Sequence, residues 1–575
     1  MQRKSIATVD EGATKEPHLF LNVTPNCDVD AVSESPTEKE LGQRIKHGNC
    51  RTALWGFFSD YCYNSTIHGV KYLGERRRPW IERVWWGIAF GFSIFLCASF
   101  IWSSWKRWQQ SPVIVTFADK STPIWQIPFP AVTICPETKV TIEFLNFTKS
   151  YNLYTEGGND NLTEDEQNIL KTVYQTCDFN LLEPTTFSSD DQVFANNSFA
   201  ETLKQITPHD LFFFCRHNNS TSCRHFAPIL TDEGICFTFN MLNGSEIYRE
   251  SALHTGYDYP KHENEAKFWS LEDGYESDAP MHTYPHRALG DGVRSGLYTW
   301  LYLSKADYDY LCRGSMQGFK VLLHSPDEVP QVAKHYFRLA MNQEITVSVK
   351  PSMFTTSDGL REYDPIRRQC FFNHERELKF FKIYTQRNCE LECVSVFTKE
   401  KCSCVKFSMP READTPICGA AKVACYMEAE YELLQMEIAK DLNKSSKASR
   451  CNCLPACTSI VYEAETSPTE LKWKKLLNAH NIPEEYFSEF QSVTLSIFFK
   501  DTQFITSKRS ELYGLTNFIA NCGGILGLFM GVSWLSIIEI IYFCSIRLFC
   551  NLRMRRRSKN LRTNLVIQKP PKAVV

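Results

Sequence analysis

Two apolar stretches of membrane-spanning length constrain the fold of this 575-residue chain more than any other feature. The first, residues 80–105, has Trp at both ends, as expected of a helix that crosses a bilayer core and meets its two interfaces. The second runs from about residue 515 to 549 and would be roughly 50 Å long as one straight helix at 1.5 Å per residue. A bilayer core is about 30 Å thick. We therefore expect the second span to tilt, to project beyond the membrane, or to break.

A basic cluster precedes the first span, and a second one follows the second span. Three arginines at 76–78 precede the first span, and nine Lys or Arg with no acidic residue follow from Arg547 onward. Lys and Arg accumulate on the cytoplasmic side of membrane proteins. We therefore expect both termini in the cytoplasm of a two-span plasma-membrane protein. A basic tail can also indicate nucleic-acid binding, but its position beside an apolar span favours a membrane surface, and we expect no nucleic-acid partner.

Residues 106–514, between the spans, have the composition of an extracellular domain. They are acidic overall and hold 16 of the 23 cysteines and seven N-x-S/T sequons. Together these features indicate disulfides and glycosylation in an oxidising compartment. Zinc binding is the alternative for the short spacings in KCSC and CNCLPAC, and the disulfide connectivity stays open. The candidate disulfide cysteines are Cys135, Cys177, Cys215, Cys223, Cys236, Cys312, Cys370, Cys389, Cys393, Cys402, Cys404, Cys418, Cys425, Cys451, Cys453 and Cys457. The candidate glycosylation sites are Asn146, Asn161, Asn196, Asn218, Asn219, Asn243 and Asn443.

Strand and helix signals alternate within this segment. Residues 129–135, 318–325, 344–350 and 493–500 alternate or run β-branched, which predicts strands. Residues 425–442 predict a helix, and a second helix is predicted to begin around Ser467, Pro468 and Glu470. The sequence contains no P-loop, zinc-hydrolase motif or nucleophile arrangement. We expect no enzyme activity, no catalytic residues, no metal site and no cofactor.

Small residues form one face of the second span. At 100° per residue this face occupies an arc of about 100°, and its members are Thr516, Ala520, Gly523, Gly524, Gly527 and Gly531. The opposite side carries Phe518, Cys522, Ile525 and Phe529. The stripe alone leaves two interpretations open: close packing against another helix through a GxxxG pattern, or the wall of a pore.

Gly531-Val532-Ser533 and Glu539 favour the pore. A plain membrane anchor needs neither, and a carboxylate at membrane depth costs several kcal/mol unless it faces protein or water. Irregular backbone is tolerated there only where it is buried in protein or lines water. Exposed carbonyls and carboxylates are the groups that cation pores use. We therefore expect the span to unwind around a water-filled path.

Short motifs in a fixed order resemble those of a known family. His68-Gly69 precedes the first span, FPAVTIC (129–135) follows it, and three further motifs are GICFTFN (234–240), GFKVLLHSPDEVP (318–330) and CNCLPACTSIVY (451–462). The family's cysteine-rich block matches the spacing of Tyr384, Cys389, Cys393, Cys402 and Cys404. From about Phe57 to Arg557 the chain resembles the degenerin/epithelial sodium channel family, and it is most like the insect pickpocket branch.

The resemblance implies a fold and an activity. The implied fold is an α+β membrane protein in which two transmembrane helices flank a large disulfide-rich extracellular domain, with a β-sheet palm and helical thumb and finger elements. The implied assembly in the bilayer is a trimer, formed with itself or with related subunits. The implied activity is passive, amiloride-sensitive conduction of sodium ions, opened by a mechanical, osmotic or chemical stimulus.

The resemblance also implies roles for single residues. Gly531, Val532 and Ser533 match the selectivity filter, and His68-Gly69 would belong to a re-entrant loop beneath it. Ala520 matches the degeneration position of the gate, whereas Asn521 stands where acid-sensing relatives carry Asp, so proton gating does not follow by analogy. The remaining implied pore residues are Gly523, Gly524, Gly527 and Glu539, the last facing the inner vestibule.

The expected organisation has five parts. They are a cytoplasmic region (1–79), a first transmembrane helix (80–105), an extracellular domain (106–514), a second transmembrane helix with pore and filter (515–546) and a basic cytoplasmic tail (547–575). Two other classes share this topology. An ATP-gated trimeric channel would need a basic cluster for phosphates, against which the acidic ectodomain argues. A scavenger-receptor-like lipid-binding protein would need neither the Gly-Val-Ser segment nor Glu539.

Overall fold

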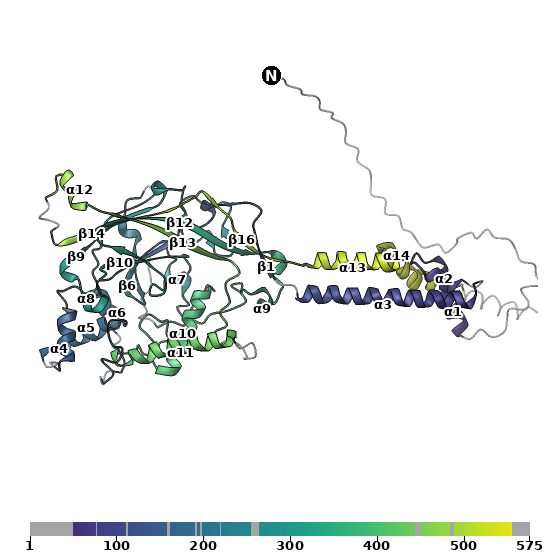
Figure 1. Ribbon diagram of the computed structural model, residues 1–575, viewed down its shortest axis with the longest axis horizontal. Helices are drawn as coiled ribbons and strands as arrows, with labels where there is room; N and C mark the ends of the chain where they lie inside the picture. The colour runs from purple at the N-terminus through teal and green to yellow at the C-terminus, as the bar shows by residue number, and fades with distance from the viewer. Residues whose placement is uncertain are drawn as a thin grey trace, which may run out of the picture. The chain divides into compact units, whose positions relative to one another are not determined.

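The computed structural model describes residues 50–554 with gaps at 76–77, 111–112, 158–160, 190–192, 196–197, 219, 255–263, 443–449, 484–487 and 552. The predicted glycosylation sites Asn196, Asn219 and Asn443 lie outside the described residues, as does most of the predicted cytoplasmic tail. The chain divides into two compact units (Figure 1). The larger unit is Pro112–Leu512, and the smaller unit comprises Met1–Ser111 and Tyr513–Val575.

The larger unit contains a seven-stranded mixed sheet built from the alternating segments of the sequence. Its strand order is β1-β16-β12-β14-β9-β4, with β13 paired to β12. The predicted strands at 344–350 and 493–500 are confirmed within β12 and β14, which run parallel with Ile345 opposite Leu495. The bounds are β1 (Val113–Phe117), β4 (Phe212–His217), β9 (Leu297–Ser304), β12 (Gln343–Thr356), β13 (Ser459–Glu470), β14 (Phe490–Phe499) and β16 (Ser507–Glu511).

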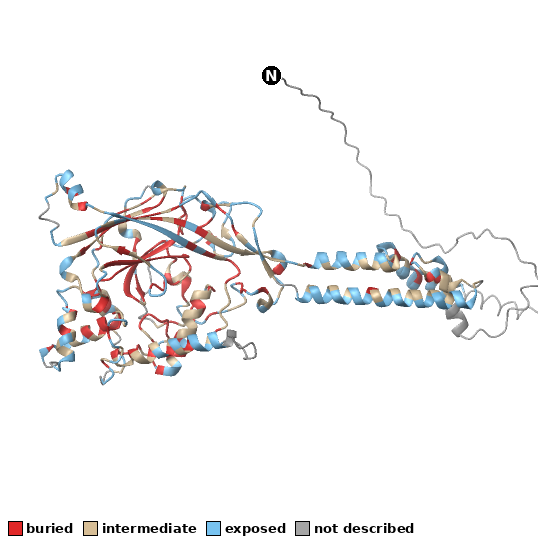
Figure 2. Cartoon of the chain, in the orientation of Figure 1, coloured by how far each residue is buried: buried red, intermediate tan, exposed pale blue. Residues whose placement is uncertain are grey.

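A second sheet of five antiparallel strands is buried deeply in the same unit. Every residue of its three middle strands is buried, which explains why their sequences read as nearly continuous apolar runs. Val132 and Val321 of this sheet share one core with Val347 and Leu495 of the larger sheet, seen as the red strands of Figure 2. In sheet order the bounds are β11 (Phe337–Ala340), β10 (Gly318–His324), β3 (Ala131–Pro136), β6 (Gly234–Phe239) and β5 (Ala227–Thr231).

Helices form a second core beside the sheets. Leu170, Leu203 and Tyr426, from three different helices, are all buried in it. The predicted helix at 425–442 is confirmed as part of α11. The helices of this unit are α4 (Phe147–Thr155), α5 (Glu164–Tyr174), α6 (Phe199–Ile206), α7 (Gly244–Ile247), α8 (Tyr310–Arg313), α9 (Pro365–Arg368), α10 (Gln386–Cys402), α11 (Val423–Leu442) and α12 (Trp473–Ala479).

All sixteen candidate cysteines are paired. Two of the eight disulfides join one end of α10 to the segment before β13, so that the helix is tied to the edge of the large sheet. Closing such loops restricts the unfolded chain and stabilises the fold. The pairs are Cys135–Cys236, Cys177–Cys312, Cys215–Cys223, Cys370–Cys457, Cys389–Cys453, Cys393–Cys451, Cys402–Cys425 and Cys404–Cys418.

The predicted helix start at 467–470 is wrong. Ser467, Pro468 and Glu470 belong to strand β13, and the helix α12 begins only at Trp473. Pro468 lies opposite Ile345 in the antiparallel pair that β13 forms with β12. A Pro that could open a helix is equally acceptable on a strand that has a neighbour on one side only. Pairing with β12 therefore overrides the local helix signal.

The described part of the smaller unit is mainly helical and includes both spans. Its first long helix, α3, continues five residues beyond the predicted boundary at 105. The second span is broken into α13 and α14, which was one of the three expected outcomes. Most of the surface of both spans is apolar and exposed in the chain, as lipid contact requires. The bounds are α1 (Cys50–Asn64), α2 (Val70–Gly74), α3 (Trp80–Gln110), α13 (Leu515–Met530), α14 (Trp534–Tyr542) and the π-helical segment η9 (Phe543–Arg547).

Candidate pore and its supporting contacts

The break in the second span is a capped turn at the predicted filter. Gly531 adopts the left-handed conformation with φ 66°, which a glycine adopts without steric cost. Its N–H donates to Gly527 O at 2.9 Å and closes the end of α13. Ser533 then caps α14, because its Oγ accepts from Ser536 N at 3.3 Å while its own N–H donates to Ser536 Oγ at 3.2 Å. The sequence Gly-Val-Ser thus ends one helix and starts the next.

The predicted His68-Gly69 motif contacts the predicted filter directly. The backbone N–H of His68 donates to Met530 O at 3.0 Å. A Cβ built on Gly531 would lie 1.6 Å from His68 Nδ1, so the imidazole ring occupies the space that any larger residue at Gly531 would need. Gly69 has φ 87°, which turns the chain into α2 directly after His68. Two motifs separated by the whole larger unit in sequence therefore form one structure.

Thr66 and Ser536 complete this contact, and sequence reasoning missed both. Thr66 binds Glu539 through its backbone N–H and its Oγ1, at 3.2 and 2.9 Å from Glu539 Oε2. Thr66 Oγ1 also lies 2.9 Å from Ser536 Oγ. Glu539 therefore has one carboxylate oxygen held by the chain. Ser536 could have been found as the third residue after a Ser helix cap, whereas Thr66 carries no comparable signal.

The segment from α1 to α2 also packs against both sides of the break. Ile67 and Val70 are buried against Met530 and Val532. Nearer the end of the span, Arg547 forms an ion pair with Asp60 at 3.2 Å. The segment from α1 to α2 therefore contacts the residues on both sides of the break and the end of the second span.

The small-residue face of α13 points away from α3. The bulky side of α13 packs on α3 instead: Phe518 stacks on Trp108 with ring centroids 5.3 Å apart, and Phe529 stacks on Phe100 at 5.6 Å. Cβ atoms built on Gly523, Gly524 and Gly527 would meet nothing within 4 Å, and Ala520 and Asn521 are exposed. Within the described residues, the small face is therefore not a packing surface for the chain's own first span.

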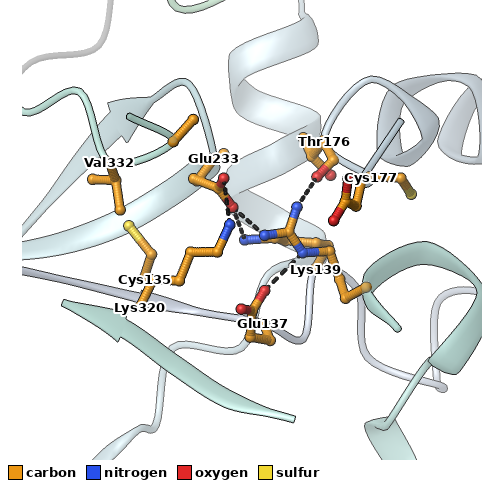
Figure 3. Close-up of polar contacts among 12 residues, drawn as sticks. Cys135, Glu137, Lys139, Thr176, Cys177, Glu233, Lys320 and Val332 are labelled. Carbon is orange, nitrogen blue, oxygen red and sulfur yellow. Dashed lines mark hydrogen bonds and ion pairs between the residues drawn. The ribbon is translucent and has the colours of Figure 1, made fainter. Parts of the chain in front are cut away.

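A buried cluster of charges in the larger unit was not predicted (Figure 3). At its centre, Arg313 Nε lies 2.7 Å from Glu137 Oε2, Arg313 Nη1 donates to Thr176 O at 2.9 Å, and Arg313 Nη2 binds Glu233. Lys320 Nζ lies 2.8 Å and Lys139 Nζ 3.6 Å from Glu233 oxygens. The cluster joins the ends of β3 and β10 to α8 and to the turn between β5 and β6.

Burial and the neighbouring charges shift the pKa values of Glu233 and Lys139 in this cluster. Burial by itself would raise the pKa of Glu233, but Lys139, Arg313 and Lys320 together hold it at about 2. Burial, and then the positive charge of Arg313, lower the pKa of Lys139 to about 7. The ionised form of Glu233 is therefore part of the folded structure at neutral pH.

Four of the predicted glycosylation sites lie on described residues. Asn146 and Asn161 are exposed, whereas Asn218 and Asn243 are half-buried. Asn146 also caps α4, because its Oδ1 accepts from Lys149 N at 3.0 Å. Within the described residues no cluster of three or more metal-binding side chains is present.

Comparison with known proteins supplies relatives over nearly the whole chain. The family model described as amiloride-sensitive sodium channel matches residues 61–543. Pickpocket protein 28 of Drosophila melanogaster is 30% identical over 524 residues, which cover 87% of this chain and 80% of that protein. Sodium channel protein Nach of the same organism is 24% identical, covering 88% and 89%. Acid-sensing ion channel 1A of Danio rerio is 22% identical, covering 84% and 86%.

The family match and the relatives agree with the two spans and the disulfide-rich α+β unit described above. Two of these relatives, sodium channel protein Nach and acid-sensing ion channel 1A, are ion channels by name. The family match includes the His68 loop, both spans and the break at Gly531–Ser533. The sequence-based resemblance is confirmed: this chain belongs to the amiloride-sensitive sodium channel family.

Proposed function

We propose that this chain is a pore-forming subunit that conducts sodium ions passively across the plasma membrane and is blocked by amiloride. The observation that carries the proposal is the break at Gly531–Ser533, which the His68 loop of the same chain holds in place. A membrane anchor gains nothing from a break, because backbone groups freed at membrane depth must find protein partners or water. A cation pore uses such carbonyl groups to replace the hydration shell of the ion.

The small-residue face of α13 lines the axis of a trimer in this proposal, formed by identical or related subunits. Support comes from the orientation of α13, which turns Phe518 and Phe529 toward α3 and leaves Gly523 and Gly527 uncovered. Small side chains allow backbones of neighbouring subunits to approach closely. Ala520 and Asn521 form the gate region, Gly531, Val532 and Ser533 the filter, and Glu539 the rim of the inner vestibule.

The proposed orientation places Pro112–Leu512 outside the cell and both termini in the cytoplasm. The eight disulfides of this unit support the orientation, because disulfides persist in oxidising compartments. In the smaller unit, Cys62, Cys97, Cys522 and Cys544 form no disulfide. The opening stimulus is mechanical, osmotic or chemical, as expected of a sensory channel.

The test is current recording from cells that express this chain and lack amiloride-sensitive current of their own. We expect an inward sodium current under at least one of the three stimuli, blocked by amiloride. Ser533→Leu should change the sodium-to-potassium permeability ratio or abolish the current. The matched control is Ser545→Leu, because Ser545 lies in η9, beyond the break, and its Oγ donates to Ile541 O at 2.5 Å, four residues earlier in the same continuous helical run.

Two outcomes contradict the proposal. Surface protein that passes no current under any stimulus, alone or with a related subunit, would favour the lipid-binding alternative. An unchanged reversal potential and current in Ser533→Leu would remove Ser533 from the filter.

A further inference from the structure

A cavity of about 270 Å³ lies in the larger unit, outside the candidate pore. Four segments form its walls: α7, the hairpin of β7 (Trp269–Ser270) and β8 (Gly274–Tyr275), the residues before α10, and the residues before β13. Since about 10–15 Å³ of such space already holds one water molecule, the cavity has room for several. It is therefore large enough for a small organic molecule and much larger than a single metal ion requires.

Part of the cavity lining is apolar and aromatic. Trp269, Tyr384 and Leu242 line it and are 8%, 2% and 3% exposed. The hydroxyl of Tyr384 donates to Leu454 O at 2.5 Å, which fixes the ring against this wall. Ile383 adds an aliphatic surface beside Tyr384. A wall of this kind favours a ligand with an apolar body.

The lining also includes the acidic residues Glu246, Glu272 and Asp273. Glu246 is half-buried, whereas Glu272 and Asp273 are exposed, so the cavity is open to solvent at these two residues. Glu246 accepts hydrogen bonds from the backbone N–H groups of Asn243 and Ala266, at 2.9 and 2.7 Å. These bonds fix the carboxylate at the cavity wall without neutralising its charge.

The other two carboxylates are held in the same way, by neutral donors. Glu272 accepts from the N–H of Asn373 through Oε1 at 2.7 Å, and Asp273 accepts from Ser270 Oγ through Oδ2 at 3.0 Å. Glu272 Oε2 and Asp273 Oδ1 keep their capacity to accept further hydrogen bonds.

Among the described residues, no basic side chain compensates the negative charge of the cavity. Its described lining contains no Lys, Arg or His, and none of the three carboxylates forms an ion pair with a described basic side chain. The nearby Lys382 binds the carbonyl of Ser245 at 2.6 Å instead. Carboxylates bind ammonium and guanidinium groups through strong charge-assisted hydrogen bonds, and aromatic faces also attract such cations.

We propose that this cavity binds a small organic cation, namely a protonated amine or guanidinium group joined to an apolar body. The cationic head binds between Glu272, Asp273 and Glu246, and the body packs on Trp269, Tyr384 and Ile383. An inorganic cation would leave the apolar wall unused. The walls include the residues just before α10 and just before β13, so the bound ligand contacts the segments that lead into both elements. The proposal concerns binding and stands whether or not the chain conducts sodium.

Three probes with the same body and different charge test the proposal on the purified full-length chain in lipid nanodiscs. They are phenethylamine, 2-phenylethanol and phenylacetate, which are cationic, neutral and anionic at pH 7. Isothermal titration calorimetry should show one saturable site per chain for the amine. The Kd of the alcohol should be at least about tenfold higher, a factor that corresponds to 1.4 kcal/mol, and phenylacetate should not bind.

Paired variants test the location. Glu272→Gln with Asp273→Asn keeps the shape and the accepting oxygens but removes two charges, and should raise the Kd of the amine at least tenfold. The control is Glu276→Gln with Asp278→Asn, which removes two exposed charges from the same region that do not line the cavity. An unchanged non-reducing disulfide map shows that each variant is folded. Equal binding of amine and alcohol, equal loss in both double variants, or displacement of the amine by millimolar calcium would each overturn the proposal.

Discussion

The backbone N–H of His68 donates a hydrogen bond to the carbonyl oxygen of Met530 at 3.0 Å. This bond joins the loop before the first span to the last residue of α13. It leaves the His68 ring against Gly531, which starts the break in the second span. In the proposed channel, any movement of the loop would therefore act on the filter without an intermediate element.

Gly531→Ala should abolish or strongly reduce the current. An alanine at φ 66° costs about 1–2 kcal/mol, and its Cβ would lie 1.6 Å from His68 Nδ1. Current density and surface biotinylation are the measurements. Gly56→Ala is the matched control, because a Cβ there meets nothing within 4 Å. His68→Ala combined with Gly531→Ala should restore part of the current, and normal current in the single variant would contradict the contact.

Thr66→Val should alter conduction through Glu539. The substitution keeps the shape and removes the hydroxyl that bonds to Glu539 Oε2 and Ser536 Oγ at 2.9 Å. We expect a changed single-channel conductance, because a carboxylate that keeps only the backbone N–H of residue 66 as a donor presents its charge differently to passing cations. In a double-mutant cycle with Glu539→Gln, the two changes should not add. Strict additivity would mean that the bond does not influence conduction.

Ala520→Val should hold the channel open at rest. Ala520 is exposed on the small face of α13, and three copies would meet near the axis of the proposed trimer. The larger side chains would be overpacked at the axis of the closed pore, at a cost of about 1–3 kcal/mol per site. Because this destabilises the closed state more than the open state, it favours opening. The expected result is a constitutive, amiloride-sensitive sodium current with reduced survival of the cells. The control is Ile519→Phe, one residue before Ala520, which should change the resting current less than Ala520→Val does. A variant that reaches the surface, responds to stimulation and stays closed at rest would contradict this prediction.

Glu233→Gln should destabilise the larger unit by about 3–5 kcal/mol at pH 7, because it leaves buried cations without their partner. The pKa of Glu233 is lowered to about 2 from an ordinary value of 4.5. Its ionised form therefore contributes its full stability above pH 4.5, and the contribution is lost as the pH falls through 2. The difference in unfolding midpoint between variant and parent should be largest at neutral pH and should narrow below pH 4.5.

Thermal unfolding followed by near-ultraviolet circular dichroism, under non-reducing conditions, measures this difference. The control is Glu265→Gln, because Glu265 is exposed and pairs with exposed Lys267 at 3.6 Å. Exposed pairs of this kind contribute at most about 1 kcal/mol. A pH-independent difference for Glu233→Gln would show that the ionised form is not what stabilises the cluster.

Local features of the chain were predictable from its sequence. The length and composition of 80–105 predicted α3, and the excess length of the second span with Gly-Val-Ser inside it predicted a break. The strands at 344–350 and 493–500 and the helix at 425–442 followed from periodicity. These features depend on residues that are close together in the sequence, so they can be predicted from a single sequence.

Contacts between distant residues were decided only by the tertiary structure. The disulfide Cys135–Cys236 and the bonds from Thr66 to Ser536 and Glu539 join residues that are far apart in sequence. The same is true of the burial of Arg313 among Glu137 and Glu233. Residues 467–470 likewise form a strand and not the predicted helix start, because they pair with β12, which is distant in the sequence. Spacing along one element is set by backbone geometry, and the sequence alone determined it. Which elements meet depends on how the whole chain buries its apolar surface and satisfies its polar groups, and only the folded structure settles that.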